Sequence, residues 1–116
     1  MPTSADFAFP ERWWDLRTGT EQESQQRAAL AHRLGIETAD GHPLFGTSVS
    51  AIGRCTACDH VLYAIGDSRY AIVHLTWTAS PPVRPPWPST TVYSSWEETE
   101  LAVMAHEPDW DNQPKN

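Results

Sequence analysis

The stretch Arg69-Tyr70-Ala71-Ile72-Val73-His74-Leu75-Thr76-Trp77-Thr78 decides the fold of this chain. It is rich in β-branched and aromatic residues, which favour strands, and its side chains alternate between two faces. One face carries Ala71, Val73, Leu75 and Trp77, and the other carries Tyr70, Ile72, His74 and Thr76. Because both faces hold bulky groups, the pattern predicts a central strand that is covered on both sides.

Further strand patterns lie on either side of this stretch. Residues 47–54 and 60–65 are separated by a bend, and a short Gly-Asp-Ser connection at 66–68 leads into the central strand. Such short links between consecutive strands predict an antiparallel meander. A proline-rich arm at 79–89 follows, after which residues 90–93 are expected to return as a short fourth strand.

Two helices are predicted from capping boxes, in which a Ser or Thr and a Glu three residues later satisfy the first backbone N–H groups. Thr20 and Glu23 start a helix expected over 21–34, with Gly35 as the residue that ends it. Ser95 likewise starts a second helix, expected over 96–105, whose last five residues are apolar nearly all round. That composition argues for burial of the second helix against the sheet.

A third, short helix is expected at the beginning of the chain, over residues 10–16. Proline suits the first turn of a helix, and Pro10 stands at its start. The adjacent Trp13 and Trp14 cannot point the same way, so we expect one in the core and the other nearer the surface.

The predicted fold class is α+β, with an antiparallel sheet of three to four strands and two flanking helices at about 21–34 and 96–105. The 116 residues are expected to form one domain, since a chain of this length buries a core without added staples. Residues 1–9 and 111–116 are expected to be loose tails.

The charge is acidic and unevenly spread. The formal net charge is −7, and residues 85–116 hold six acidic residues against Lys115 alone. An acidic field repels phosphate, which argues against nucleic acid or an anionic membrane as a partner. It either steers the chain toward a basic partner or only keeps it in solution. With no membrane-length apolar stretch, no leader-like apolar region and two cysteines, a cytoplasmic protein is expected.

The spacing Cys55-x-x-Cys58-x-His60 is the pattern closest to a metal site. Zinc needs four ligands, and without a second cysteine pair His60, His42 or His74 would have to complete the set. Two thiols that pack in a bend explain the spacing more simply. His74 is either a hydrogen-bonded core residue or the floor of a small site. With no nucleophile motif or phosphate loop, we predict no catalytic residues, no metal and no cofactor.

The residues predicted to bind a partner lie in the last third of the chain. Arg84 and Trp87 stand in the proline-rich arm, and Arg and Trp are typical of interface hot spots. The alternative is that this arm straps onto the domain's own core. The acidic candidates are Glu97, Glu98, Glu100, Asp109 and Asp111. First-turn glutamates also complement the helix dipole, which is the alternative explanation for the first two.

Several short motifs together resemble those of small bacterial proteins of unassigned function. They are Leu44-Phe45-Gly46, residues 59–63, Val73-His74-Leu75-Thr76-Trp77, Pro86-Trp87-Pro88 and Ser95-Trp96-Glu97. The likeness covers roughly half of the chain, and it provides no catalytic residues to carry over. In size, charge and single-domain build the chain is similar in character to the immunity proteins of bacterial toxin systems.

The sequence therefore predicts a non-catalytic protein-binding module, of the immunity or antitoxin type, that docks a basic protein such as a toxin. Its surface would be the acidic C-terminal third together with the arm at residues 84–87. One alternative is a small metal- or histidine-dependent enzyme that uses Cys55, Cys58, His60 and His74. Another is a homodimeric structural module, with Trp87 or an exposed sheet edge at a two-fold interface.

Overall fold

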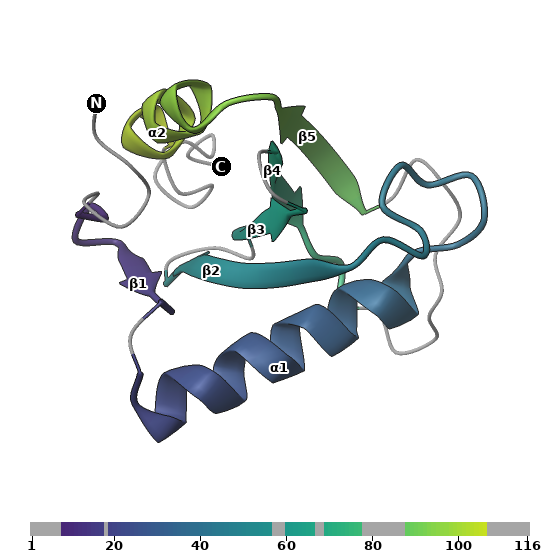
Figure 1. Ribbon diagram of the computed structural model, residues 1–116, viewed down its shortest axis with the longest axis horizontal. Helices are drawn as coiled ribbons and strands as arrows, with labels where there is room; N and C mark the ends of the chain where they lie inside the picture. Colours follow the sequence, from purple (N-terminus) through teal and green to yellow (C-terminus); the bar gives the residue numbers. More distant parts are fainter. Residues whose placement is uncertain (1–7, 18, 57–59, 67–68, 78–87, 107–116) are drawn as a thin grey trace, which may run out of the picture.

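The computed structural model describes residues 8–17, 19–56, 60–66, 69–77 and 88–106. The elements follow in the order β1 (Trp13–Asp15), α1 (Glu21–Glu37), β2 (Val49–Cys55), β3 (His60–Ile65), β4 (Arg69–His74), β5 (Ser89–Tyr93) and α2 (Trp96–Ala105). The strands form one antiparallel sheet in the order β1-β2-β3-β4-β5. Helix α1 covers one face and α2 the other (Figure 1). The predicted α+β class and the meander are confirmed, with one strand more than expected.

The central position of β4 is also confirmed. It pairs with β3 from His60↔His74 to Ile65↔Arg69 and with β5 on its other side. Ala71 and Val73 belong to the core under α1, whereas Ile72 packs in the cluster under α2. The strand ends at His74, earlier than expected, because the backbone N–H groups of Thr76 and Trp77 donate to the Glu37 carboxylate and not to a neighbouring strand. Trp77 also has φ 53, which a β-strand does not allow.

Helix α1 extends three residues beyond its predicted end and passes through Gly35. Its last residue, Glu37, is held by long-range hydrogen bonds to the segment after β4. Thr38 caps the helix by donating its backbone N–H to the Leu34 carbonyl at 3.1 Å. Hydrogen bonds to residues far along the chain thus extend the helix beyond Gly35, which was expected to end it. Leu30 and Leu34 are the leucines of the helix that are buried in the core.

The predicted helix at 10–16 is wrong, because these residues make a turn and then strand β1. The Trp13 N–H donates to the Pro10 carbonyl at 2.9 Å, and β1 then pairs with β2. A strand sends successive side chains to opposite faces, which suits two adjacent indoles. Trp13 is buried in the α2-side cluster, whereas Trp14 packs on the α1-side core and donates its indole N–H to Glu23 at 2.8 Å. The expected divergence of the two rings is therefore confirmed.

Helix α2 has the predicted bounds and the predicted cap. The Ser95 hydroxyl accepts the Glu98 backbone N–H at 3.2 Å. The helix packs against the sheet as predicted, and Thr99 and Val103 are its buried residues. One side of the helix covers the sheet, and the opposite side faces away from it. Within the described ranges, neither helix combines the length and apolar character needed to cross a membrane.

Candidate functional site

The structure describes three of the seven predicted partner-binding residues. Glu97 and Glu98 are exposed in the first turn of α2, and Glu100 is half-buried one turn further on. Arg84, Trp87, Asp109 and Asp111 lie outside the described residues. The described part of the predicted surface is therefore the side of α2 turned away from the sheet.

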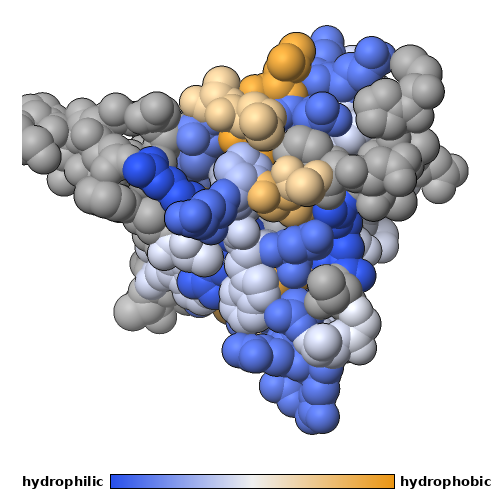
Figure 2. Space-filling view, turned by 90° about the vertical axis from the view of Figure 1, so that its left-hand side faces the viewer, coloured by the Kyte–Doolittle hydropathy of each residue, from blue (hydrophilic) through white to orange (hydrophobic). Residues whose placement is uncertain are grey.

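This side, which we call the outer face of α2, consists of five exposed residues: Glu97, Glu98, Leu101, Met104 and Ala105. It has an acidic end at the first turn and an apolar end at the last turn. Leu101 is 72% exposed and Met104 is 60% exposed, the two largest values among the big apolar side chains of the described residues. Figure 2 shows hydrophobic atoms gathered beside hydrophilic ones in the upper part of the molecule, where α2 lies.

Sequence reasoning missed this exposure because the run at 101–105 has apolar residues on every side. A helical projection contains a usable signal. Glu97 lies four residues before Leu101, so the two share a face. A glutamate avoids a core, and the face that it marks is the one that stays outside.

Glu98 has a structural task as well as a charge. Its carboxylate accepts the backbone N–H of Ser94 at 3.2 Å and the Ser94 hydroxyl at 3.1 Å. These contacts satisfy polar groups just before the start of the helix, so Glu98 has a structural role there. Glu97 remains the clearest acidic candidate for a partner on the outer face.

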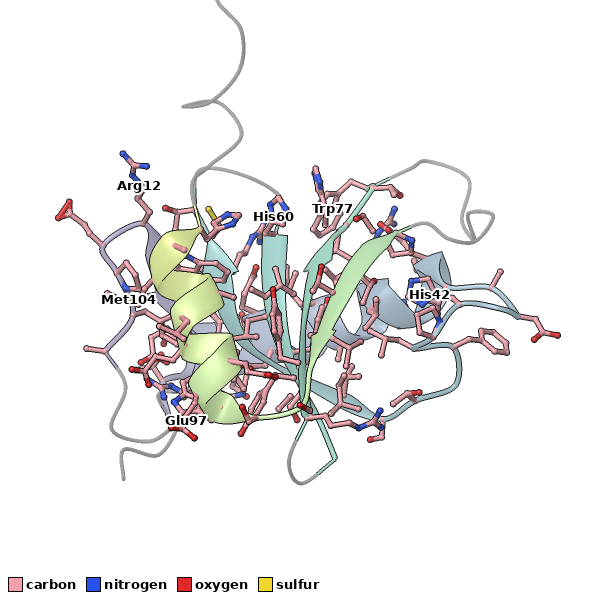
Figure 3. All side chains as sticks on the ribbon, turned by 90° about the horizontal axis from the view of Figure 1, so that it is seen from above. Arg12, His42, His60, Trp77, Glu97 and Met104 are labelled. Carbon is pink, nitrogen blue, oxygen red and sulfur yellow. The ribbon has the colours of Figure 1, made fainter. Side chains whose placement is uncertain are left out.

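A second group of polar side chains lies where α2 ends. His60 and His74 are direct partners across β3 and β4, with ring centroids 4.4 Å apart. His106 is the C-cap of α2. The centre of its ring lies 4.6 Å from that of His60 and 5.3 Å from that of Trp13. Figure 3 shows His60 at one end of the sheet, on the same margin as Trp77. The sequence pointed to His60 and His74 but missed His106, which follows a helix with no metal-ligand spacing.

This histidine group differs from the predicted metal site. Cys55 is buried in β2, and Cys58 lies outside the described residues. The planes of the His60 and His74 rings are tilted by 30° to one another. No group of three or more His, Cys, Asp or Glu within the described ranges is arranged to hold a metal ion. The structure thus brings together two of the four residues of the enzyme alternative.

His42, the other candidate ligand, has both ring nitrogens engaged. Its Nδ1 accepts the Leu44 backbone N–H at 3.0 Å, so Nε2 carries the proton and donates to the Pro88 carbonyl at 2.9 Å. The ring thereby ties the loop before β2 to the start of β5. Its role is structural.

A buried carboxylate at the end of α1 organises the chain after β4. Glu37 is 0% exposed, and its oxygens accept the backbone N–H groups of Thr76 and Trp77, each at 2.8 Å, and the Arg33 Nε at 2.6 Å. Burial raises the pKa of this carboxyl, but the hydrogen bonds from Thr76, Arg33 and Trp77 outweigh it and hold the pKa below its usual value. The guanidinium groups of Arg33 and Arg54 lie 5.1 and 5.6 Å from the centre of the Trp77 ring. No local pattern predicts the contacts of Glu37 with Thr76 and Trp77, because these residues lie 39 and 40 positions further along the chain.

Comparison with protein-family models, with curated proteins and with solved structures found no match for this chain.

Proposed function

We propose that this chain is a non-catalytic protein-binding module that docks a basic protein through the outer face of α2. The exposure of Leu101 and Met104 supports the proposal most directly. Together with Ala105 they occupy positions i, i+3 and i+4, the spacing with which a helix inserts apolar anchors into a partner's groove. A pair of adjacent, large, exposed apolar side chains is typical of an interaction site.

The charge around these anchors supports a basic partner. Glu97 and Glu98 stand one turn before them, and the last 32 residues of the chain carry a net charge of −5. The complementary surface is an apolar groove with lysine or arginine on its rim. An immunity protein bound to a basic toxin is an arrangement of this kind, and it is the specific form that we propose.

The first test replaces the anchors. We expect the double variant Leu101→Glu/Met104→Glu to bind the partner at least about 30-fold more weakly, because each buried anchor of an interface contributes about 1–2 kcal/mol or more. Immobilised wild-type and variant chains are compared for the proteins that they retain from an extract of the source cell, identified by quantitative mass spectrometry. The affinity of the protein retained by the wild type is then measured.

A matched control is Phe45→Glu, which places the same charge at a 51% exposed apolar residue outside α2. This variant is expected to retain the partner like the wild type. Thermal unfolding by circular dichroism checks that all three chains fold. Equal affinity of the double variant and the wild type for that partner would refute the proposed surface.

A second test uses salt. Charge complementarity acts mainly on the association rate, so we expect this rate to fall at least about tenfold between 50 and 500 mM NaCl, with a smaller change in the dissociation rate. Surface plasmon resonance with the identified partner measures both rates. Glu97→Gln is expected to flatten the salt dependence. An association rate that does not respond to salt contradicts the basic-partner proposal.

The pairing of His60 with His74 is the observation that favours the enzyme alternative. Metal analysis of protein purified without chelators separates the two functions. Stoichiometric zinc bound to this chain would place the histidine-dependent enzyme ahead of the binding module.

A further inference from the structure

The two edges of the sheet differ in a way that points to a second interaction surface. Strand β1 forms one edge, is three residues long and ends at the charged Asp15. Strand β5 forms the other edge and is five residues long. Its sequence is Ser-Thr-Thr-Val-Tyr, which contains no charged residue. In the described part of the chain, β5 pairs with β4 alone (Figure 1).

An edge strand presents unpaired backbone N–H and C=O groups, and proteins usually protect such edges. The usual protections within a strand are lysines, prolines, bulges or a very short length, and a helix or loop that covers the edge is another. Strand β5 carries none of the first four, and its register with β4 runs unbroken from Tyr70↔Tyr93 to His74↔Ser89. Three of its residues, Ser89, Thr91 and Val92, are exposed, Val92 by 42%. The residues of β5 therefore offer no protection of their own against a strand added beside it.

The start of this strand is held in place by contacts outside the sheet. Thr90 donates its hydroxyl to the Pro88 carbonyl at 2.9 Å, and the His42 ring donates to the same carbonyl. An edge that is already ordered loses little conformational entropy when a partner strand is added.

We propose that the partner on this edge is a second copy of the chain, whose own β5 pairs antiparallel with it across a two-fold axis. Centred on Thr91, the arrangement places Thr91 opposite its own copy, Ser89 opposite Tyr93 and Thr90 opposite Val92. All five residues of each strand are then paired, whereas a two-fold axis at any other residue would leave some of them unpaired. The two strands bring no charge to the contact, so two acidic chains meet there without like charges facing one another.

Side chains on both faces suit this pairing. Thr91 meets Thr91, a cross-strand pair that stabilises antiparallel sheets. Val92 lies on the α1 side of the sheet, since it is the register partner of Ala71. The two Val92 side chains are diagonal neighbours across the axis and bury part of each other's exposed surface. This surface is separate from the outer face of α2, so the inference goes beyond the proposed function.

Sedimentation velocity tests the proposal. The wild type is expected to change from monomer to dimer between about 1 and 500 µM, because a strand edge alone is a small interface. Val92→Lys adds a protecting charge at an exposed position and is expected to remain a monomer over this range. The matched control Phe45→Lys adds the same charge outside the edge and is expected to dimerise like the wild type. A wild type that stays monomeric, or a Val92→Lys chain that dimerises equally well, overturns the proposal.

Cross-linking tests the register. In a Cys58→Ser background, Thr91→Cys places two thiols opposite one another on the axis, with Cα atoms about 4.5–5.5 Å apart, within the range of a disulfide. This variant is expected to form a covalent dimer under mild oxidation. Ser89→Cys faces Tyr93 of the other copy and is expected to stay monomeric on a non-reducing gel. The opposite result excludes the two-fold arrangement. The Leu101→Glu/Met104→Glu variant should still dimerise, so failure of the α2 proposal and failure of this one are distinguishable.

Discussion

Replacing Trp13 with alanine is expected to lower the free energy of unfolding by about 3–5 kcal/mol, the range for removing a buried large aromatic side chain. The indole is buried in the α2-side cluster with Leu62 and Val103. Its ring stacks on Phe9 at 5.8 Å and meets the His106 ring edge-on. Urea unfolding followed by circular dichroism measures the loss.

The comparison with Trp14 makes this a test of strand β1. Trp14 is half-buried, and Trp14→Phe removes mainly the indole hydrogen bond to Glu23, at a cost of about 1 kcal/mol. Trp13→Phe keeps an aromatic ring in the cluster and should cost less than Trp13→Ala. If Trp13→Ala is no more destabilising than Trp14→Phe, the assignment of Trp13 to the core is wrong.

Glu37→Gln is expected to destabilise the protein by about 2–4 kcal/mol, since it removes the charge from a buried carboxylate that accepts several hydrogen bonds. Glutamine offers one acceptor oxygen, so its NH₂ group would face donors in either orientation: the Trp77 N–H and the Arg33 Nε–H at one position, or the Thr76 N–H at the other. The matched control is Glu21→Gln, in the exposed first turn of the same helix, which is expected to change stability by less than about 0.5 kcal/mol. A similar effect of the two substitutions would contradict the role of Glu37.

Glu37 also makes the free energy of unfolding depend on pH, in a direction that follows from its lowered pKa. Because the folded-state pKa of Glu37 is lowered, its contribution is fully present above the unfolded pKa of about 4.3 and is lost as the pH falls through the folded value. The stability difference between wild type and Glu37→Gln should therefore shrink as the pH is lowered from 6 to 3. Asp15, whose pKa is also lowered, titrates in both chains and cancels in this difference. A difference that stays constant or grows on acidification would contradict the lowered pKa.

Local signals predicted several elements well. The bounds of α2 and β3 agree with the sequence pattern, because a capping box and a short run rich in apolar, β-branched and aromatic residues act within a few residues. The α+β class follows from the same short-range patterns. Elements that depend on a distant partner were harder to predict. Strand β1 is too short to be stable alone and exists through its pairing with β2, 40 residues away at Trp14↔Arg54.

The candidate surface shows the same division. The acidic end of α2 was readable from composition, whereas the exposure of Leu101 and Met104 was not. Which side of an apolar helix meets the sheet depends on where the strands lie beneath it, and here Thr99 and Val103 face inward. Likewise, that β5 is an edge follows from the order of the strands and not from its own residues.

The sequence by itself determined the meander, the N-caps of both helices and the acidic C-terminal third, because these depend on neighbours within a few positions and on summed charge. Only the tertiary structure decided the strand at Trp13, the length of α1, the Glu37 contacts, the outer face of α2 and the open edge at β5. Each of these requires residues tens of positions apart to meet, and the free energy of such contacts is not encoded in any one stretch of the chain.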